Sequence, residues 1–135
     1  MERYKHRVNY YETDSMGIVH HSNYIRFMEE ARVDYLDQIG FNYKKLEDSG
    51  MASPVLGYSV ETKHSAKFDD IIEIEVTLAS YSGVKLEFNY KMFVGEEEIA
   101  TGITKHCFIN KEGFPIIIHK TNPEIDNKFK ELLNQ

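Results

Sequence analysis

The sequence of 135 residues has a single cysteine, three prolines, no tryptophan and no long apolar run. One cysteine excludes an intrachain disulfide and fits a reducing compartment. No stretch approaches 18 uncharged apolar residues, so we expect no membrane insertion. The charged start of the chain is followed by no apolar segment, so we expect no signal peptide. Together these absences predict a cytoplasmic protein.

Charge and composition narrow the class further. The chain has 16 Lys and Arg against 22 Asp and Glu, a formal net charge of −6, which argues against nucleic acid as a partner. Hydrophobic residues make up 41%, enough for a core in a chain of this length. No repeat or flexible linker divides the sequence, so we predict a single domain over residues 1–135.

Hydrophobic periodicity predicts the order β-α-β-β-β-β. The helix begins at Asn23, where apolar residues start to recur at spacings of three and four. Ser22 or Asn23 is its expected N-cap and Gly40 its stop. A short helical turn and loop are expected over residues 41–53. Strands are predicted for residues 4–11, 55–68, 72–78, 84–94 and 98–109, the last in the interior of the sheet, and a short helix for residues 123–133.

One long helix and a mostly antiparallel sheet predict an α+β fold in which the helix covers one face of five strands. One helix cannot cover both faces, so the other face or an edge strand needs a partner. The long strand predicted over residues 55–68 is the candidate edge. Because an unpaired edge of that length is a liability in a monomer, we expect a homodimer.

A dense polar segment, residues 10–24, lies between the first strand and the long helix. Asp14 stands near Gly17, which lets backbone approach a ligand closely, and His21 follows seven positions after Asp14. A helix N-terminus can polarise a carbonyl, and a carboxylate can activate water or attack directly. These parts suit hydrolysis of an activated acyl compound. The residues alone leave open that Asp14 only shapes a turn and that His21 is a packed or surface histidine.

The sequence offers little support for other chemistry. Asp14, His21 and Glu29 lack a recurring metal-ligand spacing, so we predict no metal site and no cofactor. Cys107 falls in a predicted strand and is expected to be a buried structural thiol. There is no glycine-rich phosphate loop and no serine nucleophile elbow.

A longer motif runs through residues 7–24, with its marked positions at Arg7-Val8, Thr13-Asp14, Gly17, Val19, His21 and Tyr24, and with Phe27 and Glu30 continuing the helix. This run closely resembles the signature of the 4-hydroxybenzoyl-CoA thioesterase family of hotdog-fold proteins. Within that family it is most similar to the bacterial acyl-CoA thioesterases associated with the Tol–Pal system. Residues 65–70 resemble the family's turn between its second and third strands. The resemblance covers about residues 4–110.

The resemblance implies a hotdog fold, with a five-stranded sheet wrapped around the long helix, and a homodimer or homotetramer with active sites at the subunit interface. It implies an acyl-CoA thioesterase in which Asp14 is the general base or the nucleophile and His21 helps to activate water or to bind. Tyr10 and Tyr24 would line the acyl pocket, and the backbone of residues 22–24 would hold the thioester oxygen. The substrate-binding positions are Tyr10, Gly17, Ser22, Asn23 and Tyr24. Candidates for the CoA phosphates are Arg26, Lys63 and Lys67, with an ordinary solvated surface as the alternative.

Two rival functions remain beside a CoA or acyl-carrier-protein thioesterase. Hotdog hydratases and dehydratases resemble one another in an Asp followed by a His five residues later. Here Val19 stands at that spacing from Asp14, and His21 comes at seven, which disfavours them. The second rival is a non-catalytic acyl-thioester-binding protein.

Overall fold

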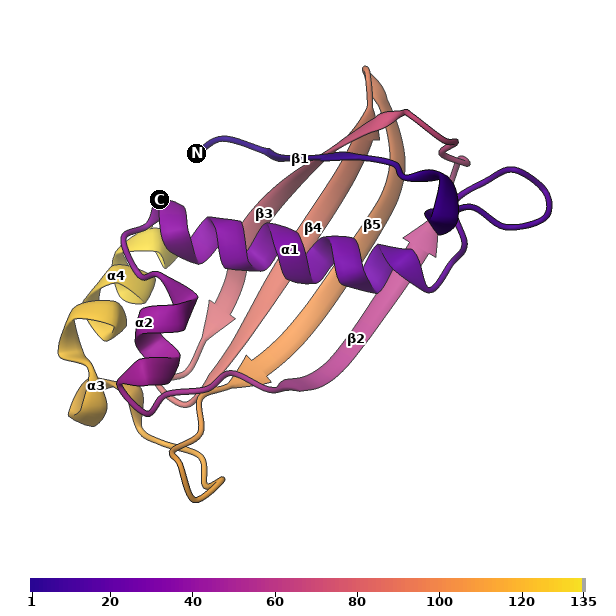
Figure 1. The fold of residues 1–135 in the computed structure, drawn as a ribbon. Coiled ribbons are helices and arrows are strands. Elements are labelled where there is room, and N and C mark those ends of the chain that lie inside the picture. The colour runs from indigo at the N-terminus through magenta and orange to yellow at the C-terminus, as the bar shows by residue number, and fades with distance from the viewer. Residues whose placement is uncertain (135) are drawn as a thin grey trace.

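The computed structural model describes residues 1–134 and contains one long helix packed on a five-stranded antiparallel sheet. Helix α1 (Asn23–Gln38) crosses the sheet, and its N-terminus lies beside the loop that follows β1 (Figure 1). This architecture confirms the predicted α+β fold. The other elements are β1 (Tyr4–Arg7), the 3-10 helix η1 (Tyr10–Glu12), α2 (Tyr43–Asp48), β2 (Val55–Thr62), β3 (Ile71–Tyr81), β4 (Lys85–Val94), β5 (Glu97–Cys107), α3 (Ile118–Thr121) and α4 (Pro123–Leu133).

The strands lie in the order β1-β3-β4-β5-β2, and every neighbouring pair is antiparallel. The expectation that the strand over residues 98–109 lies inside the sheet is confirmed, because β5 pairs with both β4 and β2. Strand β2 is an edge. Its Leu56 and Tyr58 side chains are apolar or aromatic and yet 54% and 60% exposed, so the single chain leaves this edge uncovered.

The face of the sheet that receives α1 is apolar. Phe27, Met28 and Ala31 of the helix are almost completely buried against it. Helix and sheet approach closely at Gly102 of β5, where a Cβ atom would collide with the sulfur of Met28. The glycine therefore sets how deeply α1 sits in the sheet.

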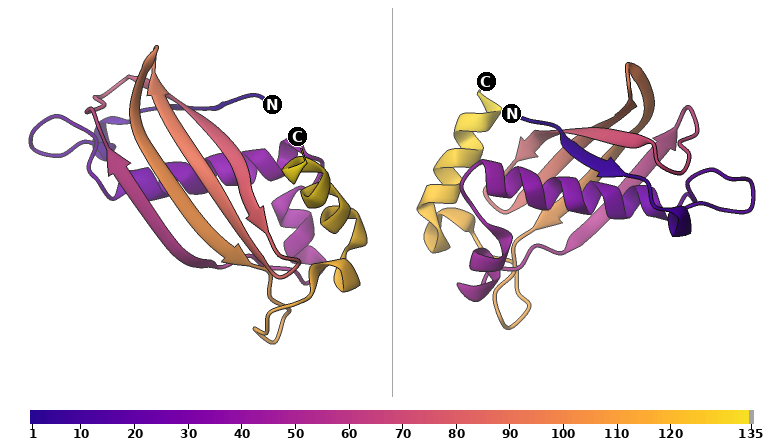
Figure 2. Two further views of the ribbon diagram at one scale, coloured as in Figure 1. Left: turned by 180° about the vertical axis from the view of Figure 1, so that it is seen from behind. Right: turned by 45° about the horizontal axis from the view of Figure 1, so that its top comes forward.

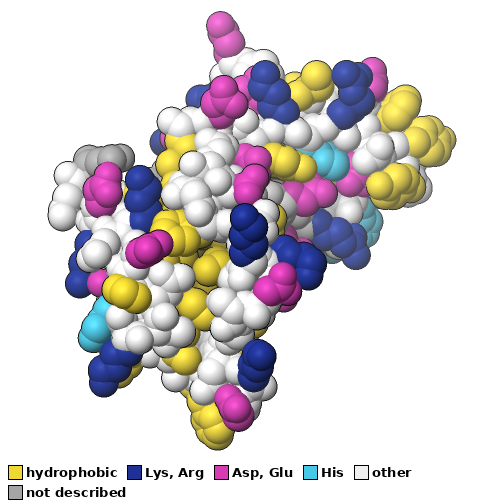
Figure 3. All heavy atoms as spheres, turned by 60° about the vertical axis from the view of Figure 1, so that its left-hand side comes forward, with side chains coloured by type: hydrophobic (Ala, Val, Ile, Leu, Met, Phe, Trp, Pro, Cys, Tyr) yellow, Lys and Arg dark blue, Asp and Glu magenta, His cyan; other side chains and the backbone are white. Residues whose placement is uncertain are grey.

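The opposite face of the sheet carries no helix (Figure 2, left). It bears polar side chains, and opposite charges meet across neighbouring strands, as with Glu75 opposite Lys91 and Glu87 opposite Lys105. Such a face is stable in water. The side of the molecule in Figure 3 shows apolar side chains at its centre with cationic and anionic side chains around them. The sheet has two edges, β1 and β2, and the predicted partner is still expected at β2.

The C-terminal residues close the far end of the molecule, beside the end of α1 (Figure 2, right). Ile118, Ile125 and Phe129 are fully buried, and the Tyr81 hydroxyl donates a hydrogen bond of 2.5 Å to Asp126. The helix predicted over residues 123–133 is confirmed as α4. No helix within residues 1–134 combines the length and apolar composition needed to span a membrane.

The first predicted strand is too long. It ends at Arg7, and residues 10–12 form η1. The reason is local: the Asn9 amide donates a hydrogen bond of 2.7 Å to the Glu12 carboxylate, which folds the chain into a turn that alternating aromatic residues do not reveal.

The second predicted strand is also too long, because β2 ends at Thr62 and residues 63–70 turn. The backbone N–H groups of Lys63 and His64 both donate to the carbonyl of Ile99, at 2.7 and 3.2 Å. Because two amides share one acceptor, the regular hydrogen-bond ladder between β2 and β5 ends here. Cys107 is buried at the end of β5 as expected.

Candidate active site

Asp14 begins the turn of a small hairpin between η1 and α1. Thr13 and Val19 pair across it, the Asp14 amide donates to the Ile18 carbonyl at 2.8 Å, and the Gly17 amide donates to the Asp14 carbonyl at 3.0 Å. Gly17 has a φ of +81°, which other residues rarely adopt. Gly17 is therefore required by the turn, and its surroundings give no support to the close ligand approach that we expected there.

Only one oxygen of the Asp14 carboxylate accepts hydrogen bonds within the turn. Its Oδ1 accepts hydrogen bonds from the backbone of Met16, at 2.8 Å, and of Ile18, at 3.4 Å. Its Oδ2 accepts none from the residues that the structure describes. The two interpretations of Asp14 are thus compatible, since one oxygen can hold the loop while the other faces a ligand.

Asp14 lies on the wall of a recess of about 270 Å³, here called the Asp14 hollow. His21 and Tyr24 line the same recess, and so do the end of β2 and the turn that follows it, residues 62–65. The structure therefore brings together Asp14, His21 and Tyr24, as predicted from the sequence. The lining residues are Asp14, Met16, Ile18, Val19, His21, Tyr24, Thr62, Lys63, His64 and Ser65.

A second recess continues from the first along the edge strand, and we call it the Tyr58 hollow. It shares His21, Tyr24 and Thr62 with the Asp14 hollow and adds Ile25 and the edge residues from Tyr58 to Val60. Burial raises the pKa of the Tyr24 phenol, so this group stays neutral and acts as a wall. A recess of this lining suits an acyl group.

The N-terminus of α1 is not capped as predicted. Ser22 precedes the helix with helical backbone angles and makes no side-chain capping bond. Its hydroxyl instead lies 2.8 Å from His20 Nδ1. The Asn23 side chain donates to the Glu12 carbonyl at 2.8 Å and accepts from Arg26 at 2.9 Å. Both expected cap residues are thus engaged elsewhere.

The backbone N–H groups here are partly occupied. The Asn23 amide donates to the His20 carbonyl at 3.0 Å, and the Tyr24 amide reaches the His21 carbonyl at 3.4 Å. Among the hydrogen bonds of residues 1–134, none uses the backbone N–H of His21. His21 lines the Asp14 hollow, so its backbone N–H is a candidate donor to a ligand oxygen.

Tyr10 lies outside both hollows of the single chain. Its ring is 76% exposed and meets Phe68 edge to face at 5.6 Å. The expectation that Tyr10 lines the acyl pocket finds no support in the single chain.

The three basic residues considered for CoA phosphates do not converge. Lys63 lines the Asp14 hollow and forms an ion pair of 3.2 Å with Glu98. Arg26 lines a different recess, the Arg26 hollow, together with Glu12, His20 and Glu30. Lys67 lines none of these three recesses. A common phosphate site made of the three is not formed within one chain.

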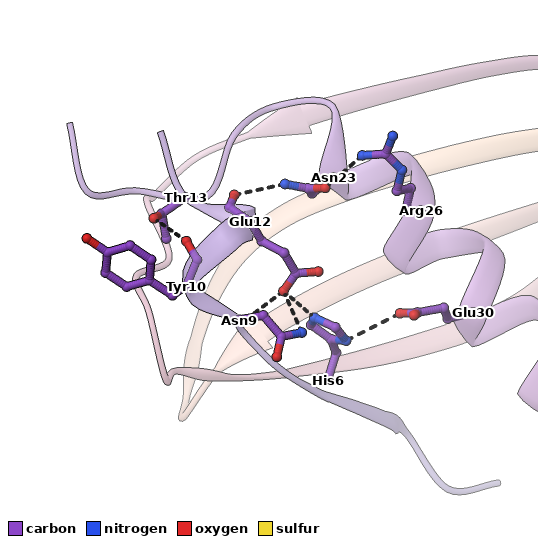
Figure 4. A network of polar contacts seen from close by, with 8 residues as sticks. All are labelled: His6, Asn9, Tyr10, Glu12, Thr13, Asn23, Arg26 and Glu30. Carbon is purple, nitrogen blue, oxygen red and sulfur yellow. Dashed lines mark hydrogen bonds and ion pairs between the residues drawn. The ribbon is translucent and has the colours of Figure 1, made fainter. Parts of the chain in front are cut away.

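The sequence reasoning missed a network on the other side of the α1 N-terminus (Figure 4). Glu12 receives hydrogen bonds from Asn9 and His6, and His6 also contacts Glu30. The Asn9-x-x-Glu12 spacing is that of a capping box and could have revealed it. In the described part of the chain, no group of three or more His, Cys, Asp or Glu side chains is arranged so that it could hold a metal ion.

The chain is similar to known proteins in sequence and in fold. The family model of the thioesterase-like superfamily matches residues 8–133 of the sequence. The acyl-CoA thioester hydrolase YbgC of Escherichia coli O6:H1 is 32% identical over 72% of each chain. The DHNA-CoA thioesterase of Staphylococcus aureus superposes with a TM-score of 0.95 at 27% identity, over 98% of this chain and 91% of that one. A hypothetical protein of Aquifex aeolicus, AQ1494, superposes with a TM-score of 0.86 at 38% identity, over 91% of this chain and 97% of that one.

Proposed function

We propose that Asp14 is the catalytic carboxylate of this chain, which belongs to the thioesterase-like superfamily of hotdog proteins and is an acyl-CoA thioester hydrolase. One observation carries the proposal: the Asp14 side chain holds its own loop through Oδ1 and leaves Oδ2 unbonded among residues 1–134, on the wall of a recess at the α1 N-terminus. A carboxylate that only shaped a turn would have no need of that recess.

The arrangement supports the following reaction. The thioester carbonyl enters the Asp14 hollow with its oxygen toward the His21 backbone N–H and the positive end of the α1 dipole. Water adds to the carbonyl carbon and gives a proton to Asp14. The carbon–sulfur bond then breaks, Asp14 returns the proton to the leaving CoA thiolate, and a carboxylic acid is released. Attack by Asp14 itself, through an anhydride that water opens, uses the same atoms.

We assign supporting roles to the neighbouring groups. The exposed His21 ring, in the same hollow, helps to orient the water or the thioester. Tyr24 and the Tyr58 hollow receive the acyl group. Lys63, already paired with Glu98, contributes little to binding CoA phosphates.

We extend the proposal to the setting of the enzyme. A homodimer joined at the β2 edge would complete the wall of the Tyr58 hollow, since that recess is bounded by edge residues. The motif in residues 7–24 supports a Tol–Pal-type thioesterase as the nearest group. The single buried Cys107 fits a cytoplasmic location.

A panel of aliphatic and aromatic acyl-CoA thioesters, with one acyl-carrier-protein thioester, tests the substrate class through release of free thiol. Asp14→Asn tests the site, because Asn keeps the turn-forming oxygen and replaces Oδ2 by an amide. We expect kcat to fall by about 10²–10⁴ with an unchanged melting temperature. In His21→Ala we expect a smaller fall in kcat, since the carboxylate of Asp14 remains.

The results separate the rivals. An Asp14→Asn enzyme with near-normal turnover would contradict the catalytic assignment and leave Asp14 as a turn residue. A wild-type protein that binds acyl-CoA and releases no thiol from any thioester would favour the non-catalytic acyl-binding protein.

A further inference from the structure

We propose that Glu12 is a positioning residue of the thioesterase, which fixes Asp14 and the N-terminus of α1 relative to each other. The inference rests on the proposed role of Asp14. Glu12 is 7% exposed, an unusual burial for a carboxylate unless it is bonded on several sides. It is the last residue of η1 and stands two residues before Asp14, where the chain enters the loop. Figure 4 shows its contacts.

The Glu12 side chain ties the start of the loop to β1. Its Oε1 lies 2.8 Å from Nε2 of His6, accepts from the Asn9 amide at 2.7 Å and accepts from the Asn9 side chain at 3.3 Å. His6 is itself held on its other side, where Nδ1 lies 3.3 Å from the Glu30 carboxylate of α1. Strand β1 and the turn thus meet at one carboxylate oxygen, and His6 links that oxygen to the helix.

The Glu12 backbone ties the end of the loop and the start of the helix. Its carbonyl accepts from the His20 amide and from the Asn23 side chain, both at 2.8 Å. Because residues 13–20 leave from and return to Glu12, this one residue sets where the loop sits on the helix. Asp14 lies just inside the loop that the Glu12–His20 hydrogen bond closes, and His21 lies just outside it.

Glu12 does not act on the substrate directly. It lines the Arg26 hollow, on the side of α1 away from Asp14, and it is absent from the lining of the Asp14 hollow. Its contribution must therefore pass through geometry, and a displacement of reacting groups by about 1 Å can cost 10²-fold in rate.

Glu12→Ala and Glu12→Gln test the inference, measured as kcat and KM below the unfolding transition. Glu12→Ala removes every side-chain bond, and we expect kcat to fall about 100-fold with a smaller change in KM, because the walls of the Asp14 hollow remain. Glu12→Gln keeps an oxygen at the Oε1 position, so its kcat should stay within about tenfold of the wild type. Equal losses in both variants would contradict positioning and indicate that the charge itself is used.

Tyr81→Phe is the matched control. It removes a part-buried hydrogen bond to a carboxylate, that of Asp126, at the opposite end of α1. It should lower the stability of the protein and leave kcat unchanged, which separates misplacement from a general loss of stability.

A double-mutant cycle with Asp14→Asn decides the route of the effect. If Glu12 acts through Asp14, Glu12→Ala should cost less than about threefold in the Asp14→Asn background, since residues that act as a unit are not additive. The same 100-fold loss in both backgrounds would overturn the inference while leaving the role of Asp14 intact. A fully active Asp14→Asn enzyme would overturn the proposed role of Asp14 and, with it, this positioning role.

Discussion

The two ends of α1 are held in opposite ways. At the N-terminus, the helix carries no side-chain cap, and recesses lie on both sides of it. Its attachments there are made largely by a loop and by Glu12. The C-terminal half of the helix, here called the enclosed half, packs on the sheet with Ala31, Arg32, Tyr35 and Leu36 buried. Its end lies near α2 and α4 (Figure 1).

The enclosed half contains a buried polar network. Arg32 is 6% exposed, and its guanidinium lies 3.4 Å from Nε2 of His106. Thr104 links that ring to the Tyr90 hydroxyl through two contacts of 2.7 Å. Within residues 1–134, no buried side-chain nitrogen or oxygen lacks a partner. A network satisfied in this way resists opening.

This difference between the two ends shows how one helix can contribute both to stability and to the active site. The enclosed half fixes the direction of the helix, so the exposed half can leave its N-terminal donors and the Asp14 hollow open to a ligand. Changes at the exposed end should therefore alter turnover and assembly. Changes at the enclosed end should alter stability alone.

The largest expected effect concerns completion of the exposed end by a second copy. We expect the wild type to sediment as a homodimer or larger assembly at tens of micromolar. Leu56→Lys places a charge on the uncovered β2 edge, which blocks strand pairing. This variant should become monomeric and lose most of its thioesterase activity, because the edge also bounds the Tyr58 hollow.

Phe114→Lys is the control for this prediction, since Phe114 is an apolar residue outside the sheet that is even more exposed than Leu56, at 66% against 54%. It should keep both assembly and turnover. A wild-type monomer with full activity would contradict the expected subunit interface.

Most of the fold could be predicted from the sequence, because periodicity reports which face of each element is buried. The helix from Asn23 and the helix over residues 123–133 follow from that signal. The ends of β1 and β2 could not be predicted in this way. They depend on hydrogen bonds at Asn9 and Ile99, and alternation of side chains continues through such turns without a mark.

An intermediate effect is expected at the enclosed end, as pH falls. Burial, together with the positive charge of Arg32, lowers the pKa of His106 to about 4 in the folded protein, against about 6.5 in the unfolded chain. Above pH 6.5 both states are neutral and His106 adds no pH dependence. Between pH 6.5 and 4 only the unfolded chain takes up the proton, so stability should fall by about 2–3 kcal/mol in total.

His106→Gln isolates this contribution, because carboxylates titrate in both proteins alike. Urea unfolding at pH 7, 5.5 and 4 should give a steeper loss for the wild type than for His106→Gln, with equal kcat at pH 7. Parallel curves would show that His106 is protonated in the folded protein, and the enclosed end would then tolerate a second buried charge.

The candidate site could be predicted only in part. Tyr10 and Lys67 lie outside the two hollows, and the hydrogen bonds around the site did not follow from the sequence. Asp14, His21 and Tyr24 stand in a recognisable motif, and the structure places them on one recess. The only sequence signal for Glu12 is the Asn9-x-x-Glu12 capping-box spacing. That spacing marks a turn and does not predict the bonds of Glu12 to residues on three elements. The assignment of a cap to Ser22 failed for a related reason: a serine before a helix has the right chemistry, but the neighbouring His20 competes for its hydroxyl.

The smallest expected effect concerns that serine. Loss of a true N-cap costs about 0.5–2 kcal/mol, but Ser22 makes no capping bond, so Ser22→Ala should change the free energy of unfolding by less than about 0.5 kcal/mol. Asn23→Ala is the contrasting variant. It breaks the buried bond to the Glu12 carbonyl and should cost about 1–3 kcal/mol, with slower turnover. Both are measured by urea unfolding. A loss above 1 kcal/mol in Ser22→Ala would mean that the hydroxyl caps the helix in solution, and the N-terminus of α1 would then be less open than its contacts indicate.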